Sequence, residues 1–283
     1  MTDHIAVFSD IHGNSKVALS VAGFMLDGDT ALQPNAAQRW LNENYLNNID
    51  KLKRIKRRGD TLTVVLNGDI TEGDLKARTY GVHVRNPVRI AQFVTLILEP
   101  LYKIADRCIF ISGTPSHVGI DGNLEEAVAD DCTIAVPEPT TGRKLWSHAC
   151  LDVQGRRINI RHVGPVRGKA KLRRKALDDL AEDIIIQCAT DGEKLPDLSI
   201  HSHGHFYCDT HDNYPVRVIT TPAWQLAPDY MYGKPIHAIS DIGSIIISVK
   251  NGELECHPIL YPVLPEKALT IQSILQPLTS GKN

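Results

Sequence analysis

The sequence feature that most constrains the fold is a series of short apolar runs, each of which ends in side chains able to bind a metal ion. In the first half of the chain these runs cover residues 5–8, 61–66 and 108–112. Branched and aromatic residues dominate the runs, as is typical of buried β-strands. Segments with helical spacing lie between them, and antiparallel strand patterns follow in the second half. This order predicts a layered α/β domain.

The first run leads into Asp10 and His12, with Gly13 after them. Side chains two positions apart on an extended chain project to the same side, so both can reach one point in space. A carboxylate and an imidazole are suitable ligands for zinc, manganese or iron. An isolated pair of this kind is more typical of an acidic turn with a solvated histidine. The metal-site interpretation is favoured because four further strand ends carry comparable side chains.

The side chains at those further strand ends are Asp69, Thr114, His117, His162, His203 and His205. In open α/β sheets, ligands bind beyond the carboxyl ends of the strands, so we expect these positions to converge. Two carboxylates and several imidazoles exceed what one tetrahedral ion needs. Their number fits two ions about 3.5–4 Å apart, with one carboxylate between them.

The order of these motifs is D-x-H, then G-D, then a glycine-led loop with a histidine, then a lone histidine, and finally H-x-H. In this order they resemble the calcineurin-like metallophosphoesterases, over residues 5 to about 260. The resemblance implies a four-layer α-β-β-α sandwich of two mixed sheets flanked by helices. We expect residues 1–265 to form this metallophosphoesterase domain and residues 266–283 to form a C-terminal tail.

The resemblance also implies a role for each motif residue. One metal would be held by Asp10, His12 and His205, and the second by His162 and His203, with Asp69 as the bridge. Such a chain is a binuclear metallophosphoesterase, in which a hydroxide activated by two divalent metals attacks a phosphoester. Manganese is the favoured metal, with iron, zinc, nickel or magnesium as alternatives.

The third motif departs from the usual G-N-H-[DE] of the family, because the chain has G-T-P-S-H at residues 113–117. In the family the asparagine binds the second metal and the histidine assists catalysis. Two interpretations stay open: Thr114 supplies a weaker oxygen ligand, or His117 itself moves towards the metal. His117 is a candidate proton donor to the leaving group, and Asp69 is the other candidate catalytic residue. This variant resembles uncharacterised family members from bacteriophages and prophages.

The net charge of the chain does not indicate a substrate, but a local cluster of basic residues does. Lys plus Arg number 31 and Asp plus Glu number 33, which gives a net charge of −2. A basic stretch surrounds His162, and within it Arg161 and Arg167 are the expected contacts to phosphate. We therefore expect hydrolysis of a phosphodiester, as in a nuclease with nucleic acid as its partner. The alternatives are a phosphomonoesterase acting on a protein, nucleotide or small molecule, and a catalytically degenerate binding scaffold.

The sequence indicates a cytoplasmic protein that does not enter a membrane. Its opening segment lacks the basic residues and long apolar core of a signal peptide. No apolar stretch approaches the ~20 residues of a membrane span. The six cysteines form no C-x-x-C pair, so we expect free thiols in a reducing compartment.

Periodicity also predicts individual elements. Helices are expected over residues 16–26, from 35 to about 58, over 88–105, over 124–128 and over 170–189. Pro100 should kink or split the third of these helices. Strands 145–153 and 157–163 are expected to pair with each other. Asn251 and Gly252 together predict a β-hairpin.

Overall fold

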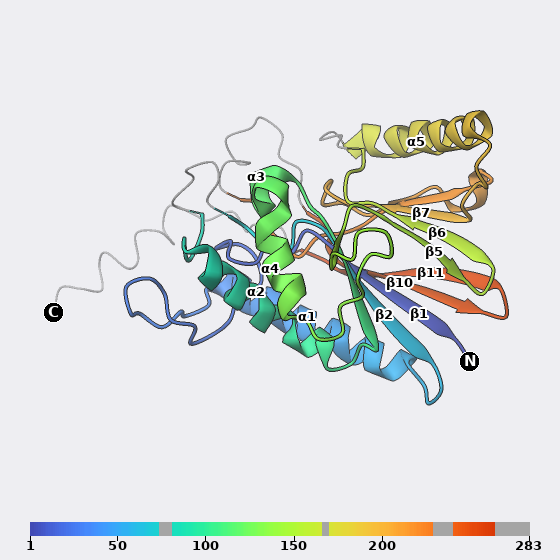
Figure 1. The fold of residues 1–283 in the computed structure, drawn as a ribbon. Coiled ribbons are helices and arrows are strands. Elements are labelled where there is room, and N and C mark those ends of the chain that lie inside the picture. Colours follow the sequence, from blue (N-terminus) through green and yellow to red (C-terminus); the bar gives the residue numbers. More distant parts are fainter. Residues whose placement is uncertain (74–80, 166–169, 229–239, 264–283) are drawn as a thin grey trace.

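Two mixed β-sheets pack face to face at the centre of the molecule (Figure 1). The computed structural model describes residues 1–73, 81–165, 170–228 and 240–263. The first sheet has the strand order β11-β10-β1-β2-β3-β4, and the second has the order β5-β6-β7-β9-β8.

The elements have the following bounds. The first sheet contains β1 (Asp3–Phe8), β2 (Thr61–Asn67), β3 (Arg107–Ile111), β4 (Leu145–Trp146), β10 (Ile242–Lys250) and β11 (Glu253–Tyr261). The second contains β5 (Ala149–Val153), β6 (Arg156–Ile160), β7 (Leu198–His201), β8 (Cys208–Asp209) and β9 (Arg217–Thr220). The helices are α1 (Ala36–Ile55), α2 (Pro87–Tyr102), α3 (Pro115–Val118), α4 (Asn123–Asp131) and α5 (Ala170–Asp191).

Three apolar clusters join the four layers. Side chains such as Val7, Ile109 and Ile200 fill the space between the two sheets. On the other face of the first sheet, α1, α2 and α4 pack through a second cluster (Figure 1). A third cluster contains Leu177 of α5 and Val218 of β9, and it attaches α5 to the outside of the second sheet. The predicted four-layer sandwich of two mixed sheets flanked by helices is therefore confirmed.

Strand direction brings the polar strand ends together. β1, β2 and β3 are parallel, with Val7 opposite Val65 and Val65 opposite Ile109. β6, β7 and β9 are parallel in the second sheet. The carboxyl ends of parallel strands lie at the same edge of a sheet. The loops that carry the candidate ligands therefore leave each sheet at a common edge.

Local signals explain several element ends. Asn35 caps α1: its side chain accepts the backbone N–H of Gln38, and the Gln38 side chain accepts the N–H of Asn35. Asn86 caps α2 in a similar way, just before the proline that opens this helix. Asn251 and Gly252 have φ of 52° and 77°, as a two-residue turn between β10 and β11 requires. The predicted hairpin is confirmed.

The helix predicted over residues 16–26 is wrong. Part of the backbone of this segment bonds to distant parts of the chain. The N–H of Lys16 donates to the carbonyl of Gly81, and the carbonyl of Val17 accepts from the N–H of Leu226. These tertiary partners satisfy the backbone groups that a helix would have paired, so helical spacing alone misled the prediction.

Two further predictions need correction. The strand expected over 145–153 is divided between the sheets, because β4 pairs with β3 while β5 pairs with β6. Of the kink or split predicted at Pro100, the split is wrong, since α2 runs through this residue and ends at Tyr102, while a kink there stays a prediction. The C-terminal tail, residues 266–283, lies outside the described residues, and its separation from the domain stays a prediction. No helix in the described part of the chain is both long and apolar enough to cross a membrane.

Candidate metal centre

The predicted ligands lie on loops that follow strands of both sheets. The residues with left-handed backbone conformations include Asp10, His12, Asp69, His203 and His205, with φ between 45° and 68°. Such conformations are unfavourable for non-glycine residues and persist where the surroundings hold them, often at functional sites. Here the N–H of Asp10 donates to the carbonyl of Gly68 at 3.0 Å, and that of His12 to the carbonyl of Asp69 at 2.8 Å. The loops after β1 and β2 therefore hold each other in place.

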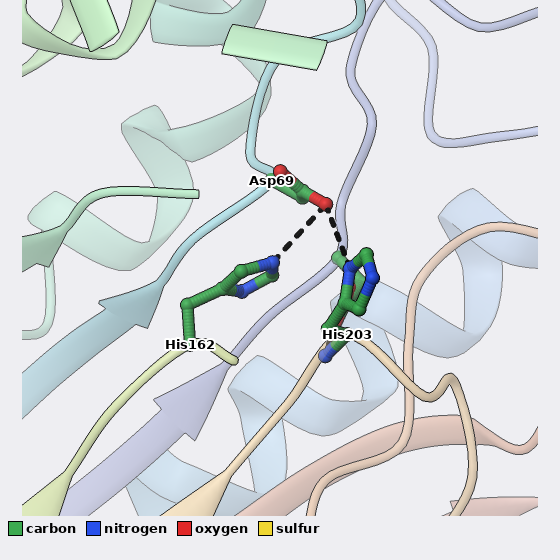
Figure 2. Close-up of side chains that lie close together, drawn as sticks. Asp69, His162 and His203 are labelled. Atoms are coloured by element: carbon green, nitrogen blue, oxygen red, sulfur yellow. Dashed lines mark hydrogen bonds and ion pairs between the residues drawn. The ribbon is translucent and has the colours of Figure 1, made fainter. Parts of the chain in front are cut away.

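One half of the centre consists of Asp69, His162 and His203 (Figure 2). The Nε2 atom of His162 lies 3.1 Å from Oδ2 of Asp69, and Nδ1 of His203 lies 3.5 Å from the same oxygen. Asp10 joins this group, and one ligand atom from each of the four residues lies within 4.8 Å of the others. We call these four residues the second ion site.

The other half consists of Asp10, His12 and His205, which we call the first ion site. Nε2 of His205 lies 3.3 Å from Oδ1 of Asp10 and 3.2 Å from Nε2 of His12. Ligand atoms of these three residues also lie within 4.8 Å of one another. Asp10 thus contributes to both groups. The bridging role expected of Asp69 stays a prediction.

The hydrogen bonds of the imidazoles turn nitrogen lone pairs towards the centre. Nδ1 of His162 donates to the carbonyl of Asn67 at 2.8 Å, so in the neutral ring Nε2 carries a lone pair. That lone pair faces the carboxylate of Asp69. Nδ1 of His12 lies 2.7 Å from the carboxylate of Glu72, which likewise leaves Nε2 to face His205. Facing lone pairs require a cation between them, either a proton or a metal ion.

Buried atoms without partners support a metal ion at this place. Within the described residues, Oδ1 of Asp10, Nε2 of His162 and Nδ1 of His203 are buried and have no hydrogen-bond partner. Buried polar atoms are rarely left unsatisfied, because their desolvation is costly. Carboxylate oxygens with imidazole nitrogens form a donor set that suits zinc, manganese or iron. The residues present therefore fit divalent metal ions.

The electrostatics of the centre favour positive charge. Burial opposes ionisation of Asp69, yet the close imidazoles of His162 and His203 hold the pKa of its carboxyl well below the usual value. Asp10 is also buried, and the neighbouring His205 lowers the pKa of its carboxyl. Burial lowers the pKa of His162, but its contact with the Asp69 carboxylate and the charge of Asp10 outweigh this and raise the pKa to about 9. The carboxylates thus stay anionic and attract a cation.

Glu72 is a site residue that the sequence analysis missed. Its Oε2 lies 2.7 Å from Nδ1 of His12, and its Oε1 lies 2.9 Å from Nδ1 of His117. Burial opposes its ionisation, but the bonds with His117 and His12 lower the pKa of Glu72 to about 2. It therefore orients both imidazoles as an anion. Its position three residues after Asp69, in G-D-x-x-E, was the signal that could have found it.

Thr114 and His117 occupy different places around the centre. The N–H of Thr114 donates to Oδ1 of Asp69 at 2.6 Å, and its hydroxyl lies 3.1 Å from both oxygens of that carboxylate. His117 instead lies against Glu72, with its ring 4.6 Å from that of His12. Thr114 thus touches the second ion site and His117 borders the first. Which of the two replaces the asparagine of the family motif stays a prediction.

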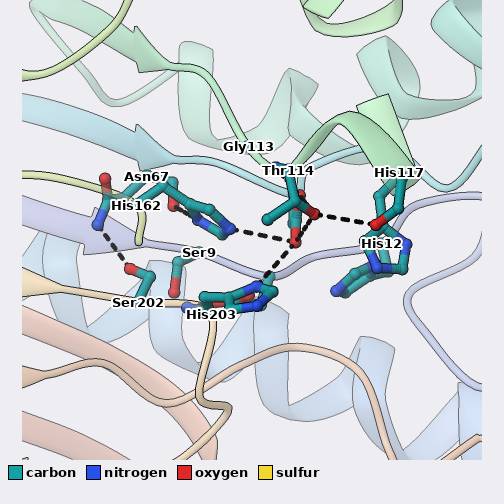
Figure 3. A network of polar contacts seen from close by, with 12 residues as sticks. Ser9, His12, Asn67, Gly113, Thr114, His117, His162, Ser202 and His203 are labelled. Carbon is teal, nitrogen blue, oxygen red and sulfur yellow. Dashed lines mark hydrogen bonds and ion pairs between the residues drawn. The ribbon is translucent and has the colours of Figure 1, made fainter. Parts of the chain in front are cut away.

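A hydrogen-bonded layer of small polar side chains supports the centre (Figure 3). The amide of Asn67 donates to the hydroxyl of Ser202, which accepts from Thr221 at 2.8 Å. The hydroxyls of Thr221 and Ser9 lie 2.6 Å apart. These contacts join the ends of β1, β2 and β7. Networks of this kind orient the residues that bind a metal.

Of the two arginines predicted to contact phosphate, the structure describes only Arg161. Arg161 is exposed and directly precedes the buried His162. Its carbonyl accepts a hydrogen bond from Asn67, which holds the backbone of this residue beside the centre. Arg167 lies outside the described residues. Contact of either residue with a substrate stays a prediction.

Comparisons with known proteins find only distant similarity. No family model and no curated protein sequence matches the chain. Vacuolar Protein Sorting 29 from Cryptosporidium parvum is similar in structure, with 11% identity and a TM-score of 0.40, over 92% of this chain and 98% of the other. A predicted phosphoesterase from Streptococcus pneumoniae has 10% identity and a TM-score of 0.38, over 93% and 95% of the two chains. Similarity at this level carries no argument.

The architecture itself agrees with the resemblance seen in the motifs. Two mixed sheets pack together with helices on both outer faces. The motif loops from the two sheets bring Asp10, Asp69, His162 and His205 into one cluster of metal-binding side chains. The chain thus forms a four-layer α/β sandwich with a candidate metal centre.

Proposed function

We propose that this chain is a hydrolase that cleaves phosphoesters with two divalent metal ions. The observation that carries the proposal is the convergence of two overlapping groups of buried and half-buried metal-binding side chains at the carboxyl ends of β1, β2, β6 and β7. Bound there, two divalent cations supply Lewis acidity that polarises a phosphate and makes water more acidic. The chain contributes the ligands, their orientation and a proton donor.

His117 is the proposed proton donor to the leaving oxygen. Its Nδ1 lies 2.9 Å from the carboxylate of Glu72, which stays anionic because its pKa is about 2. This bond holds the ring through its Nδ1 atom. A histidine held in this way can transfer a proton at neutral pH. Only a fifth of its side chain is exposed, at 20% relative accessibility, so the ring is placed firmly.

The substrate we favour is a phosphodiester, with nucleic acid as the proposed partner. The exposed Arg161, a permanent cation, directly precedes the buried His162 in the chain. Arginine binds phosphate oxygens through paired N–H donors. The imidazoles of His203 and His205 are 30% and 22% exposed, so a substrate can reach the centre from solvent. Manganese as the metal and the cytoplasm as the compartment belong to the same proposal.

The test combines elemental analysis with two chromogenic substrates. We expect two metal ions per chain, and with manganese we expect hydrolysis of bis-p-nitrophenyl phosphate but not of p-nitrophenyl phosphate. His162→Ala should abolish this turnover. His257→Ala, a matched control on an exposed histidine of β11, should preserve it. Preferential cleavage of the monoester would instead support a phosphomonoesterase, and no turnover with any metal would support a binding scaffold.

A further inference from the structure

A fully buried carboxylate lies beneath the loops that follow β2 and β3. Glu125, in the first turn of α4, has no exposed surface. Its Oε1 accepts the N–H of Ile70 at 2.8 Å, and its Oε2 accepts the N–H of Gly113 at 2.7 Å. Ile70 directly follows Asp69, and Gly113 directly precedes Thr114. One side chain of α4 therefore holds both loops.

The two loops meet very closely at this point. A Cβ atom on Gly113 would lie 2.2 Å from both the backbone N and Oδ1 of Asp69, so only glycine fits there. The contact lets the N–H of Thr114 donate to Oδ1 of Asp69 at 2.6 Å. The orientation of the Asp69 carboxylate thus depends on the spacing between the loops. Glu125 determines that spacing, because it bonds to a backbone N–H of each.

A role in anchoring α4 alone does not account for this residue. A buried carboxylate is costly, and an apolar side chain of similar volume would pack at least as well. Burial and the charge of Asp69 raise the pKa of Glu125 to about 8, whereas the two N–H groups and the start of the helix favour its anionic form. What an apolar residue could not supply is two acceptors, one for each loop.

We propose that Glu125 is a positioning residue that sets the metal affinity of the second ion site. It acts through the backbone of the two loops and touches neither metal nor substrate. The inference rests on the proposed function, because it presumes that the chain binds a metal pair. It predicts that loss of the two-acceptor geometry weakens the second ion site while the first ion site, held by Asp10, His12 and His205, keeps its affinity.

The test is calorimetric titration of the metal-free full chain with manganese. In Glu125→Gln one of the two N–H donors faces an amide NH₂ group instead of an oxygen. We expect its second binding step to weaken about tenfold or more, as for other residues that orient metal ligands, while the first step is unchanged. His162→Ala, which removes a ligand of the second ion site, identifies the step that is lost.

Glu126→Gln is the matched control. Glu126 is the next residue of the same helix, and its carboxylate is bound at the surface by Arg143. This variant should bind both ions as the wild-type chain does. If Glu125→Gln does not fold, Glu125→Asp replaces it, since the shorter side chain cannot reach both N–H groups and the same selective weakening is expected.

Two outcomes would overturn the inference. Unchanged affinity at both steps would show that Glu125 does not position the second ion site. Equal weakening of both steps, with a broadened unfolding transition, would assign it a role in the fold alone. A wild-type chain that binds fewer than two ions would instead overturn the proposed function, so the two failures are distinguishable.

Discussion

At the scale of single residues, the centre depends on contacts made by atoms that face away from it. Asn67 and Glu72 orient His162 and His12 through their Nδ1 atoms, so that both Nε2 atoms point inward. The rings are therefore in place before any ligand arrives. Organised donors of this kind spare the reorganisation that binding would otherwise require.

Asp69→Asn should prevent loading of a metal pair. The substitution keeps the size of the side chain but removes the charge that lies 3.1 Å from His162 and 3.5 Å from His203. We expect the affinity for one of the two ions to fall by at least about tenfold. Elemental analysis of the purified variant measures this directly. Two ions retained per chain would contradict the role assigned to this carboxylate.

His117→Ala should separate catalysis from metal binding. If this imidazole donates a proton to the leaving group, turnover should fall by about 10²–10⁴-fold while metal content stays the same. Steady-state rates and metal analysis on one preparation make the comparison. Equal loss of both quantities would make His117 a metal ligand instead.

At the scale of elements, an ion pair joins the edge strand β8 of the second sheet to its neighbour β9. Asp209 of β8 is only 4% exposed, and Arg217 of β9 bonds to both of its oxygens at 3.0 and 2.7 Å. The N–H of His211 and the hydroxyl of Tyr207 also donate to this carboxylate. The short strand β8 is thus held in place by these side-chain contacts as well as by its backbone pairing with β9.

Asp209→Asn should lower the free energy of unfolding by about 3 kcal/mol at neutral pH, because it leaves Arg217 without its charged partner. Burial opposes ionisation of Asp209, but Arg217 and the N–H of His211 lower the pKa of its carboxyl below 3.8. A carboxyl whose pKa is lower in the folded than in the unfolded chain stabilises the fold at pH values above its unfolded-state pKa. This contribution to stability is lost as the pH falls through the folded-state pKa.

Urea unfolding at pH 7 and below pH 4 measures the effect. The difference between wild type and Asp209→Asn should shrink at the acidic pH. Asp212→Asn, an exposed carboxyl of the neighbouring turn, is the control and should unfold like the wild type. A difference that does not depend on pH would show that Asp209 does not act through its charge.

At the scale of the whole molecule, the two sheets are joined by apolar packing along most of their length and by the metal centre at one edge. Asp10 and Asp69 bury two carboxylates in that region. Concentrated negative charge in a buried site is unfavourable without cations. On the proposed function, ion binding at this candidate centre stabilises the fold.

Removal of metal should lower the melting temperature of the chain. Ions that bind only the folded state stabilise it by about 2.7 kcal/mol at a concentration one hundred times the dissociation constant. Thermal unfolding in a chelator and then in added manganese measures the shift, which should grow with manganese concentration. A melting temperature that is the same in both conditions would argue against a buried metal site.

Much of the element order was predictable because it follows from local patterns. The helix start near Asn35 and the turn at Asn251 are encoded by neighbouring residues, and both occur as expected. The helix predicted over residues 16–26 is absent because backbone partners of this segment, such as Gly81, lie elsewhere in the chain. The single strand predicted over 145–153 is wrong because its two halves pair with strands of different sheets. Periodicity does not tell which strand lies beside a given segment.

The sequence by itself determined which strands end in metal-binding side chains, because alternation of apolar runs and polar ends is a local property. Only the tertiary structure decided that Asp10 belongs to both ion sites, that Glu72 orients two histidines, and that Glu125 holds two loops. These contacts depend on the strand order of the sheets and on the close approach of loops from distant parts of the chain. No pattern of neighbouring residues encodes such distances.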